Sequence, residues 1–184
     1  LRQEMKILIL GIGNVMFGDE GLGVHFINLI SQNFNFKSSL HELSFIDGGT
    51  MANALTPLIA NSDYLIVCDC IEADDSKAGD VYFFDYNAMP KSIKWSGSAH
   101  EVEMLQTLQM CELSGVLPKG VKVLGVVPKR IEPMSFSLSS QAKSAVKTMQ
   151  KVLLDELNKL GFSCEQKANF NIDEILSKWL KALY

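Results

Sequence analysis

Short apolar runs alternate with segments of helical periodicity along this chain, and that alternation restricts its fold more than any other feature. The runs lie at residues 6–10, 43–46, 64–68 and 121–127, and each is followed by glycine, aspartate or proline. Between them, apolar residues recur every three or four positions, as in helices with one buried face. Strands that alternate with helices predict an α/β fold whose sheet is mostly parallel.

The segment 81–84 departs from this rhythm. It follows the third run after a polar loop of about ten residues, which is too short for a crossover helix. We therefore predict an antiparallel strand at the sheet edge. Helices are expected near 98–114 and from Ser139 or Ser140 to Gly161, while Thr56 and Pro57 either start a helix or kink one that begins at Thr50. The prediction is a three-layer sandwich, with a twisted, mostly parallel sheet between helices on both faces.

The length of 184 residues, 47% of them hydrophobic, fits one α/β domain, which we place at 5–164. Residues 165–184 are expected to add a C-terminal amphipathic helix, because Asn171 and Glu174 have capping-box spacing and an apolar stripe follows. This stripe either packs on the chain's own body or docks a partner, including another copy of the chain as a homo-oligomer. Residues 1–4 read as a leader or a remnant before Met5.

Charge and hydropathy exclude several classes of protein. The chain has 17 basic and 21 acidic residues, a net charge of −4, and its basic residues are scattered. Nucleic acid and anionic membrane surfaces are therefore not expected as partners. No apolar run approaches the ~18 residues that span a bilayer, so we expect a cytoplasmic protein. The cysteines lack zinc-site spacing and are expected to be reduced, buried thiols: Cys68, Cys70, Cys111 and Cys164.

Ligands of parallel sheets gather beyond the carboxyl ends of the strands, and residues 11–20 lie at the first of these ends. This glycine loop opens with G-x-G, but Met16 stands where a dinucleotide fingerprint needs its third glycine. Asp19 and Glu20 would also repel a pyrophosphate at the helix start. The simplest alternative is that Asp19 caps the helix and Glu20 complements its dipole.

Two further residues occupy comparable positions. Asp69 ends the buried run 64–68, where a carboxylate needs a cation or several donors unless it caps the next turn. His100 lies in the first turn of a helix capped by Ser98, and the positive helix end favours a neutral imidazole able to bind a metal. The alternative is a surface histidine. His25 and His41 are expected to be structural or exposed.

Glu20, Asp69 and His100 together would form an open metal site. Three protein ligands leave room for water or substrate, and mixed carboxylate and imidazole ligation suits nickel or zinc. No local signature such as H-E-x-x-H fixes their geometry, so the trio is a hypothesis from position alone.

Several motifs, taken in order, resemble the maturation endopeptidases of nickel–iron hydrogenases. The resemblance covers about residues 5–161, and its motifs are Ile7-Leu-Ile-Leu-Gly-Ile-Gly-Asn14, Gly18-Asp-Glu-Gly21, Gly23-Val24, Asp47-Gly-Gly-Thr50, Leu65-Ile-Val-Cys-Asp69, Ser98-x-His100, Gly125-Val-Val-Pro128 and Glu132-Pro133. Each motif alone is weak, but the ordered set is specific.

The resemblance implies an α/β sandwich and an aspartyl-type endopeptidase that removes the C-terminal extension of the hydrogenase large-subunit precursor after nickel insertion. It also implies that Glu20, Asp69 and His100 are the catalytic and metal-binding residues, and that Asp47 helps in substrate recognition. The nickel would arrive with the substrate, and zinc or cadmium would replace it in a crystal. This large-subunit precursor is the implied partner.

The residues leave the chemistry open. The metal either polarises the scissile carbonyl or activates a water, and Glu20 or Asp69 is the alternative general base. A serine triad is not indicated, because no G-x-S-x-G elbow occurs. A Cys68 or Cys70 nucleophile with His100 is poorly supported by the apolar strand around it. The rival functions are a nucleotide-binding module and a non-enzymatic, nickel-sensing hydrogenase chaperone.

Overall fold

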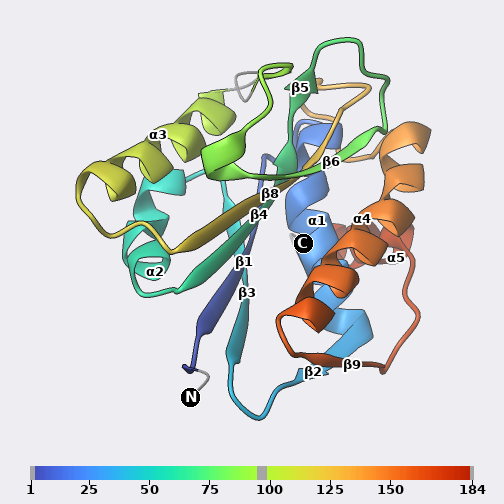
Figure 1. Ribbon diagram of the computed structural model, residues 1–184. Helices are drawn as coiled ribbons and strands as arrows, with labels where there is room; N and C mark the ends of the chain where they lie inside the picture. The colour runs from blue at the N-terminus through green and yellow to red at the C-terminus, as the bar shows by residue number, and fades with distance from the viewer. Residues whose placement is uncertain (1–2, 95–98, 183–184) are drawn as a thin grey trace.

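A five-stranded sheet forms the centre of the computed structural model, which describes residues 3–94 and 99–182 but not the side chains of 99–102 (Figure 1). The strand order is β3-β1-β4-β8-β6. The first four of these strands are parallel, and β6 runs antiparallel to β8 at the edge, as predicted. Their bounds are β1 Lys6–Ile12, β3 Glu42–Gly49, β4 Tyr64–Cys70, β6 Val81–Asp85 and β8 Gly120–Val126.

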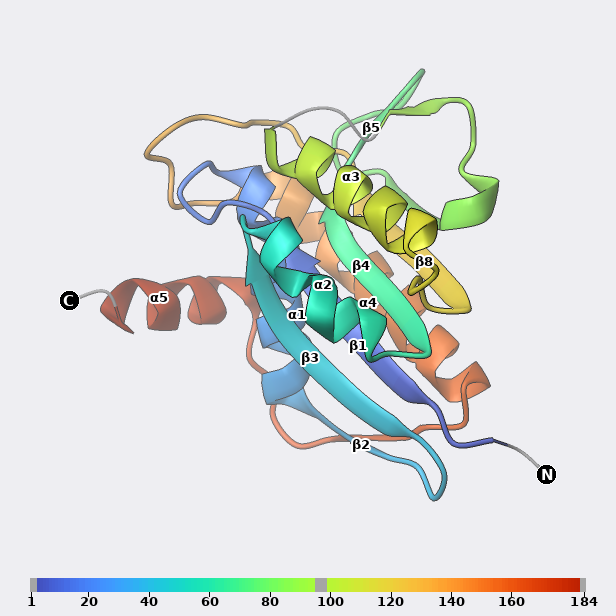
Figure 2. The ribbon, with the colours of Figure 1, turned by 90° about the vertical axis from the view of Figure 1, so that its left-hand side faces the viewer.

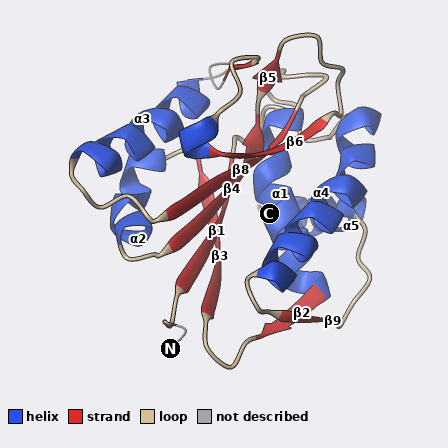
Figure 3. Cartoon of the chain, viewed as in Figure 1, coloured by secondary structure: helices blue, strands red, loops and turns tan. Residues whose placement is uncertain are grey.

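Helices cover both faces of this sheet, which confirms the predicted three-layer sandwich (Figure 3). One face carries α1 (Leu22–Asn33), α4 (Ser140–Lys159) and α5 (Ile172–Ala182), and the other carries α2 (Thr56–Ala60) and α3 (Ala99–Leu113). Three short 3-10 helices are η1 (Asp19–Gly21), η2 (Ala52–Leu55) and η3 (Tyr86–Ala88). Two small antiparallel ribbons were not predicted: β2 (Phe34–Lys37) with β9 (Ser163–Gln166), and β5 (Glu72–Ala73) with β7 (Ile93–Lys94).

The side chains of β1 show why its sequence is apolar throughout. Ile7 and Ile9 pack into the core beneath α1 and α4, whereas Leu8 and Leu10 pack into the core beneath α2 and α3. Successive residues of a strand point to opposite faces, so a strand covered on both sides needs an unbroken apolar run.

Two crossovers in opposite directions reverse the strand order within this sheet. From β1 the chain passes through α1 to β3 on one side, and from β3 it passes through α2 to β4 on the other side. The strand order therefore reverses between β1 and β4. Loops that leave neighbouring strands at such a point diverge and leave a crevice at the carboxyl ends.

The starts of α4 and α5 follow the predicted capping residues. Ser139 rather than Ser140 caps α4, because its Oγ accepts a hydrogen bond from the Ala142 N–H at 3.1 Å. At the start of α5, Asn171 and Glu174 form the expected capping box, with reciprocal bonds of 3.0 and 2.7 Å. Pro57 lies in the first turn of α2, after the separate turn η2, so it starts this helix rather than kinking a longer one.

The C-terminal helix packs on the chain's own body. Its apolar face is buried beside α1, and Lys143 of α4 pairs with Asp173 at 2.6 Å. The domain boundary expected after residue 164 falls inside β9. Cys68, Cys70 and Cys111 are buried, but Cys164 in β9 is exposed, so the expectation of four buried thiols is wrong for Cys164. Within the described residues, no helix is both long and apolar enough to cross a membrane.

His25 joins α1 to α5. Its ring is almost completely buried and meets the Trp179 ring edge-on, with centroids 5.9 Å apart. Burial lowers the pKa of His25 from 6.5 to about 4, because the charged imidazolium would lose its hydration. His25 is therefore structural, which is one of the two roles expected for it.

This burial predicts acid sensitivity. Between its folded pKa and its higher unfolded pKa, His25 binds a proton only in the unfolded chain, so stability falls as the pH drops through this window. We expect the free energy of unfolding to lose about 2 kcal/mol between about pH 7 and about pH 5 from this residue alone. Urea titrations of the wild type and of His25→Phe test this, since the variant should lack that part of the pH dependence. An equal pH dependence in both proteins would contradict it.

Candidate functional site

The glycine loop owes its glycines to close packing of the backbone. Gly13 has a φ of 137°, and a Cβ there would overlap the carbonyl oxygen of Glu20. A Cβ on Gly23 would overlap the carbonyl oxygen of Cys68 in β4. Without side chains at these positions, η1 and the start of α1 can lie directly against the ends of β1 and β4.

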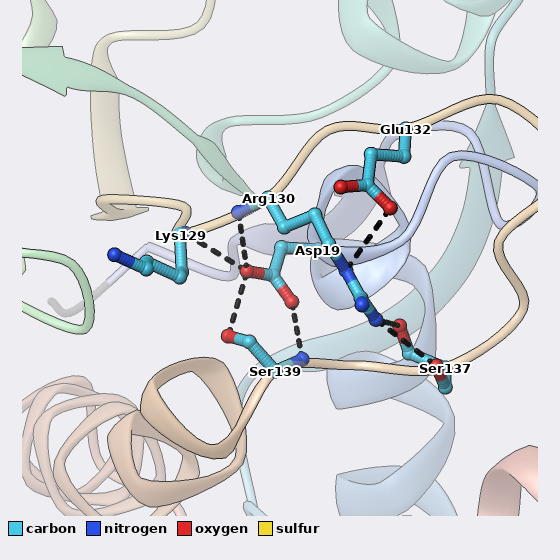
Figure 4. A network of polar contacts seen from close by, with 6 residues as sticks. All are labelled: Asp19, Lys129, Arg130, Glu132, Ser137 and Ser139. Atoms are coloured by element: carbon cyan, nitrogen blue, oxygen red, sulfur yellow. Dashed lines mark hydrogen bonds and ion pairs between the residues drawn. The ribbon is translucent and has the colours of Figure 1, made fainter.

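Asp19 is fully buried and holds this loop to the segment between β8 and α4 (Figure 4). Its Oδ2 accepts hydrogen bonds from the Lys129 N–H at 2.9 Å, the Arg130 N–H at 3.0 Å and the Ser139 hydroxyl at 2.7 Å. Its Oδ1 accepts one from the Ser139 N–H at 2.6 Å. Gly18 and Gly21 occupy the cap positions of η1 and α1, so the interpretation of Asp19 as a helix cap is wrong.

Backbone bonds extend the same attachment. The Asp19 N–H donates to the Arg130 carbonyl at 3.0 Å, and the Gly18 N–H donates to the Ser135 carbonyl at 2.7 Å. The Ser135 N–H in turn donates to the Met16 carbonyl at 3.0 Å. The β8–α4 segment (residues 127–139) is thus hydrogen-bonded along one side of the loop that carries Glu20. Ser139, which both caps α4 and binds Asp19, had no signal in the sequence beyond its capping position.

Glu20 differs sharply from its neighbour Asp19. Its side chain is only 1% exposed, yet its Oε1 has no hydrogen-bond partner among the described residues. A buried carboxylate oxygen without a donor raises the free energy of the fold, so such a group points to a ligand that completes it. A cation is the chemical complement of that oxygen.

Asp69 lies at the buried end of β4, with its Oδ1 accepting a hydrogen bond from the Cys70 N–H at 2.8 Å. Cys68 and Cys70 face the core beneath α1 and α4, so Asp69 faces the opposite side, as the period of two predicted. The Cys70 Sγ donates to the Asp19 carbonyl at 3.1 Å, which joins the end of β4 to η1. Asp69 and Glu20 thus come from adjoining segments.

Cys68 is not suited to nucleophilic attack. Its thiol is fully buried, and burial, followed by the negative charge of Asp69, raises the pKa of Cys68 well above its ordinary value. The thiolate is the nucleophilic form, so this environment disfavours the reactive species.

The helix α3 begins at the same end of the sheet as the glycine loop (Figure 2), and His100 lies in its first turn. Its side chain and the predicted cap Ser98 lie outside the described residues. The described side chains contain no group of three or more His, Cys, Asp or Glu that would hold a metal. That set does not include His100, so the trio of Glu20, Asp69 and His100 stays a prediction.

Asp47 is exposed to solvent. Its Oδ1 closes a turn by accepting a hydrogen bond from the Gly49 N–H at 3.0 Å. The Gly49 carbonyl accepts from the Gly13 N–H at 2.9 Å, which places this turn beside the glycine loop. A part in substrate recognition stays a prediction. His41 lies away from these loops, where its Nδ1 accepts from the Met5 N–H at 3.1 Å just before β1.

Comparison with known proteins assigns the chain to a family. Residues 24–156 match the family model described as hydrogenase maturation protease. The chain belongs to this family. It is 46% identical over 153 residues to protein HydD of Wolinella succinogenes, an alignment that covers 83% of the chain and 95% of the relative. Identity to the hydrogenase 2 maturation protease of Escherichia coli is 26% over 157 residues, covering 85% and 93%.

A solved structure agrees with this assignment. The hydrogenase maturating endopeptidase HybD of E. coli superposes with a TM-score of 0.77 at 25% identity, covering 89% of this chain and 98% of its own. The hydrogenase maturation protease described here is thus an endopeptidase on the fold that the sequence predicted. The nucleotide-binding alternative loses its support, because packing explains the glycines and the loop ends in buried Glu20.

Proposed function

We propose that this maturation protease removes the C-terminal extension of a nickel–iron hydrogenase large-subunit precursor once nickel has been inserted. Glu20, Asp69 and His100 would contact the nickel that the precursor carries, so cleavage would require that nickel has been inserted into the precursor. The observation that carries this proposal is the buried Glu20 carboxylate, whose Oε1 has no donor within the described part of the chain.

The donor set fits this cargo. Two carboxylates and one imidazole are ligands that a borderline divalent ion accepts, and three of them leave coordination positions for groups of the substrate. A neutral imidazole is the form that binds a metal, and His100 is proposed to supply it. Asp47, on the neighbouring turn, is proposed to contact the segment that is cut.

In the proposed hydrolysis, one water adds to the scissile carbonyl and passes a proton to a carboxylate of Glu20 or Asp69. The C–N bond then breaks, and the proton moves to the leaving amine. Because the pKa of Cys68 is raised by burial and by Asp69, attack by water is favoured over attack by this thiol. Nickel bound at the same place would polarise the carbonyl.

The test uses purified, nickel-loaded precursor and the full-length protease. Wild type should produce a faster-migrating large subunit, whereas His100→Ala should leave the precursor uncut because one of three metal contacts is lost. His41→Ala is the matched control, since this imidazole lies beside the first residues of β1. Precursor that stays uncut in the presence of the wild-type protease would contradict the proposed activity.

A second comparison separates a protease from a nickel-sensing chaperone. Loss of the precursor's extension only when the protease is added identifies a protease rather than a chaperone. If nickel-free precursor also stays uncut, cleavage is coupled to the bound nickel. Equal processing of nickel-free and nickel-loaded precursor would contradict the role assigned to the trio while leaving the peptidase activity intact.

A further inference from the structure

Exposed apolar side chains gather around the loops that carry the candidate site. Of the eight large apolar side chains exposed in the described part of the chain, four lie on these loops: Met16 (42% exposed), Met51 (65%), Ile131 (39%) and Met134 (72%). The other four belong to α2, α3 and the turn after α3. Half of the exposed apolar groups thus lie beside one small part of the surface.

Backbone bonds join the three segments that carry these four residues. Met16 lies in the glycine loop, and its carbonyl accepts from Ser135, next to Met134. A bridge pairs Gly18 with Ile131. The bond between Gly13 and Gly49 holds the turn before Met51 against the same loop. The four side chains therefore stand on one connected framework, which we call the apolar rim.

Met134 has an unfavourable backbone conformation, although its side chain is largely exposed to water. Its φ is 58°, in the left-handed region that a side chain with a Cβ adopts at a cost. The side chain is also 72% exposed, so burial in the free protein offsets little of this cost. Strain of this kind is characteristic of residues that serve binding or catalysis. Three of the four rim residues are methionines, whose flexible thioethers adapt to a partner surface.

We infer that the apolar rim docks the folded body of the large-subunit precursor around its C-terminal segment. This inference rests on the proposed function. In the proposed function, a segment cut at Glu20 and Asp69 would enter beside the glycine loop, whose backbone is bonded to the other rim segments, so the protein attached to that segment would cover the rim. A second copy seated on the rim would instead obstruct this entrance. The rim is therefore assigned to precursor affinity rather than to the cleavage step.

The experiment replaces Met16, Met51 and Met134 together by glutamine, which keeps their length and removes their apolar character. With nickel-loaded precursor as substrate, KM should rise at least about tenfold, as expected when anchor side chains are lost, while kcat stays within about twofold. The control carries Met110→Gln and Leu113→Gln, two residues that are 60% and 83% exposed at the far end of α3. Its KM should equal that of wild type.

Each other outcome is informative. An unchanged KM in the rim variant, with active wild type, overturns the docking inference and leaves the proposed function standing; inactive wild type overturns the proposed function itself. A change in sedimentation of the protease alone, with an unchanged KM, would assign the rim to self-association and overturn the inference. If the triple variant melts at a lower temperature, Met134→Asn serves instead, because asparagine tolerates the left-handed conformation; its KM should rise as well.

Discussion

Glu20→Gln is expected to abolish processing of the nickel-loaded precursor without weakening the fold. The carboxylate is buried and its Oε1 lacks a donor among the described residues, so its charge costs stability in the absence of substrate. A neutral amide of the same shape should leave the free energy of unfolding unchanged or raise it by about 1 kcal/mol. The processing rate should fall by about 100-fold or more, through loss of a general base or of a metal contact.

Gel mobility of the precursor and urea unfolding of the protease measure the two effects separately. Glu132→Gln is the matched control, because it makes the same change at an exposed carboxylate of the β8–α4 segment, 3.6 Å from the Arg130 side chain. This control should process normally. A Glu20→Gln protein that unfolds several kcal/mol more easily would show that Glu20 is a structural residue, and normal processing would remove it from the site.

Asp19→Ala is expected to cause the largest loss of stability of any single change proposed for this protein. The substitution removes the acceptor of four hydrogen bonds and leaves buried donors of the β8–α4 segment without partners. Losing one side of such a buried polar network costs about 3–5 kcal/mol. Urea unfolding of the purified variant measures this loss.

Ser139→Ala provides a reference for the loss of unfolding free energy expected in Asp19→Ala. It removes one hydroxyl, which donates to Asp19 and caps α4, so it should cost only about 1–2 kcal/mol. The Ser139 N–H still reaches Asp19 in this variant. If Asp19→Ala were the milder of the two substitutions, the central place of the Asp19 carboxylate in the network would be refuted.

The contrast between Asp19 and Glu20 shows where sequence reasoning succeeds. Apolar runs that end in a polar residue predicted the parallel strands, and the strand-end rule placed Glu20 and Asp69 after β1 and at the end of β4, where both are buried. Their part in the site stays a prediction. These predictions depend on local periodicity and on a general property of parallel sheets. Both sources of information are present in a single sequence.

The hydrogen-bond donors to Asp19 could not be predicted from local sequence patterns. Its position before a helix indicated a local cap, but its donors come from residues 129–139, more than one hundred positions along the chain. Nothing in the local pattern distinguishes a carboxylate that binds a distant loop from one that caps its own helix. The ribbon of β2 and β9 was missed for the same reason, since Phe34 finds its pairing partner at Gln166.

The exposure of Cys164 gives this protein a convenient handle for spectroscopy. The other three cysteines are buried, so a maleimide dye should attach at β9 alone, which pairs with β2 at the end of the molecule away from the glycine loop (Figure 1). Partial burial raises the pKa of the Cys164 thiol, so mildly alkaline buffer favours the coupling. Fluorescence anisotropy of the labelled protease would then follow its encounter with the large subunit without a reporter close to the glycine loop.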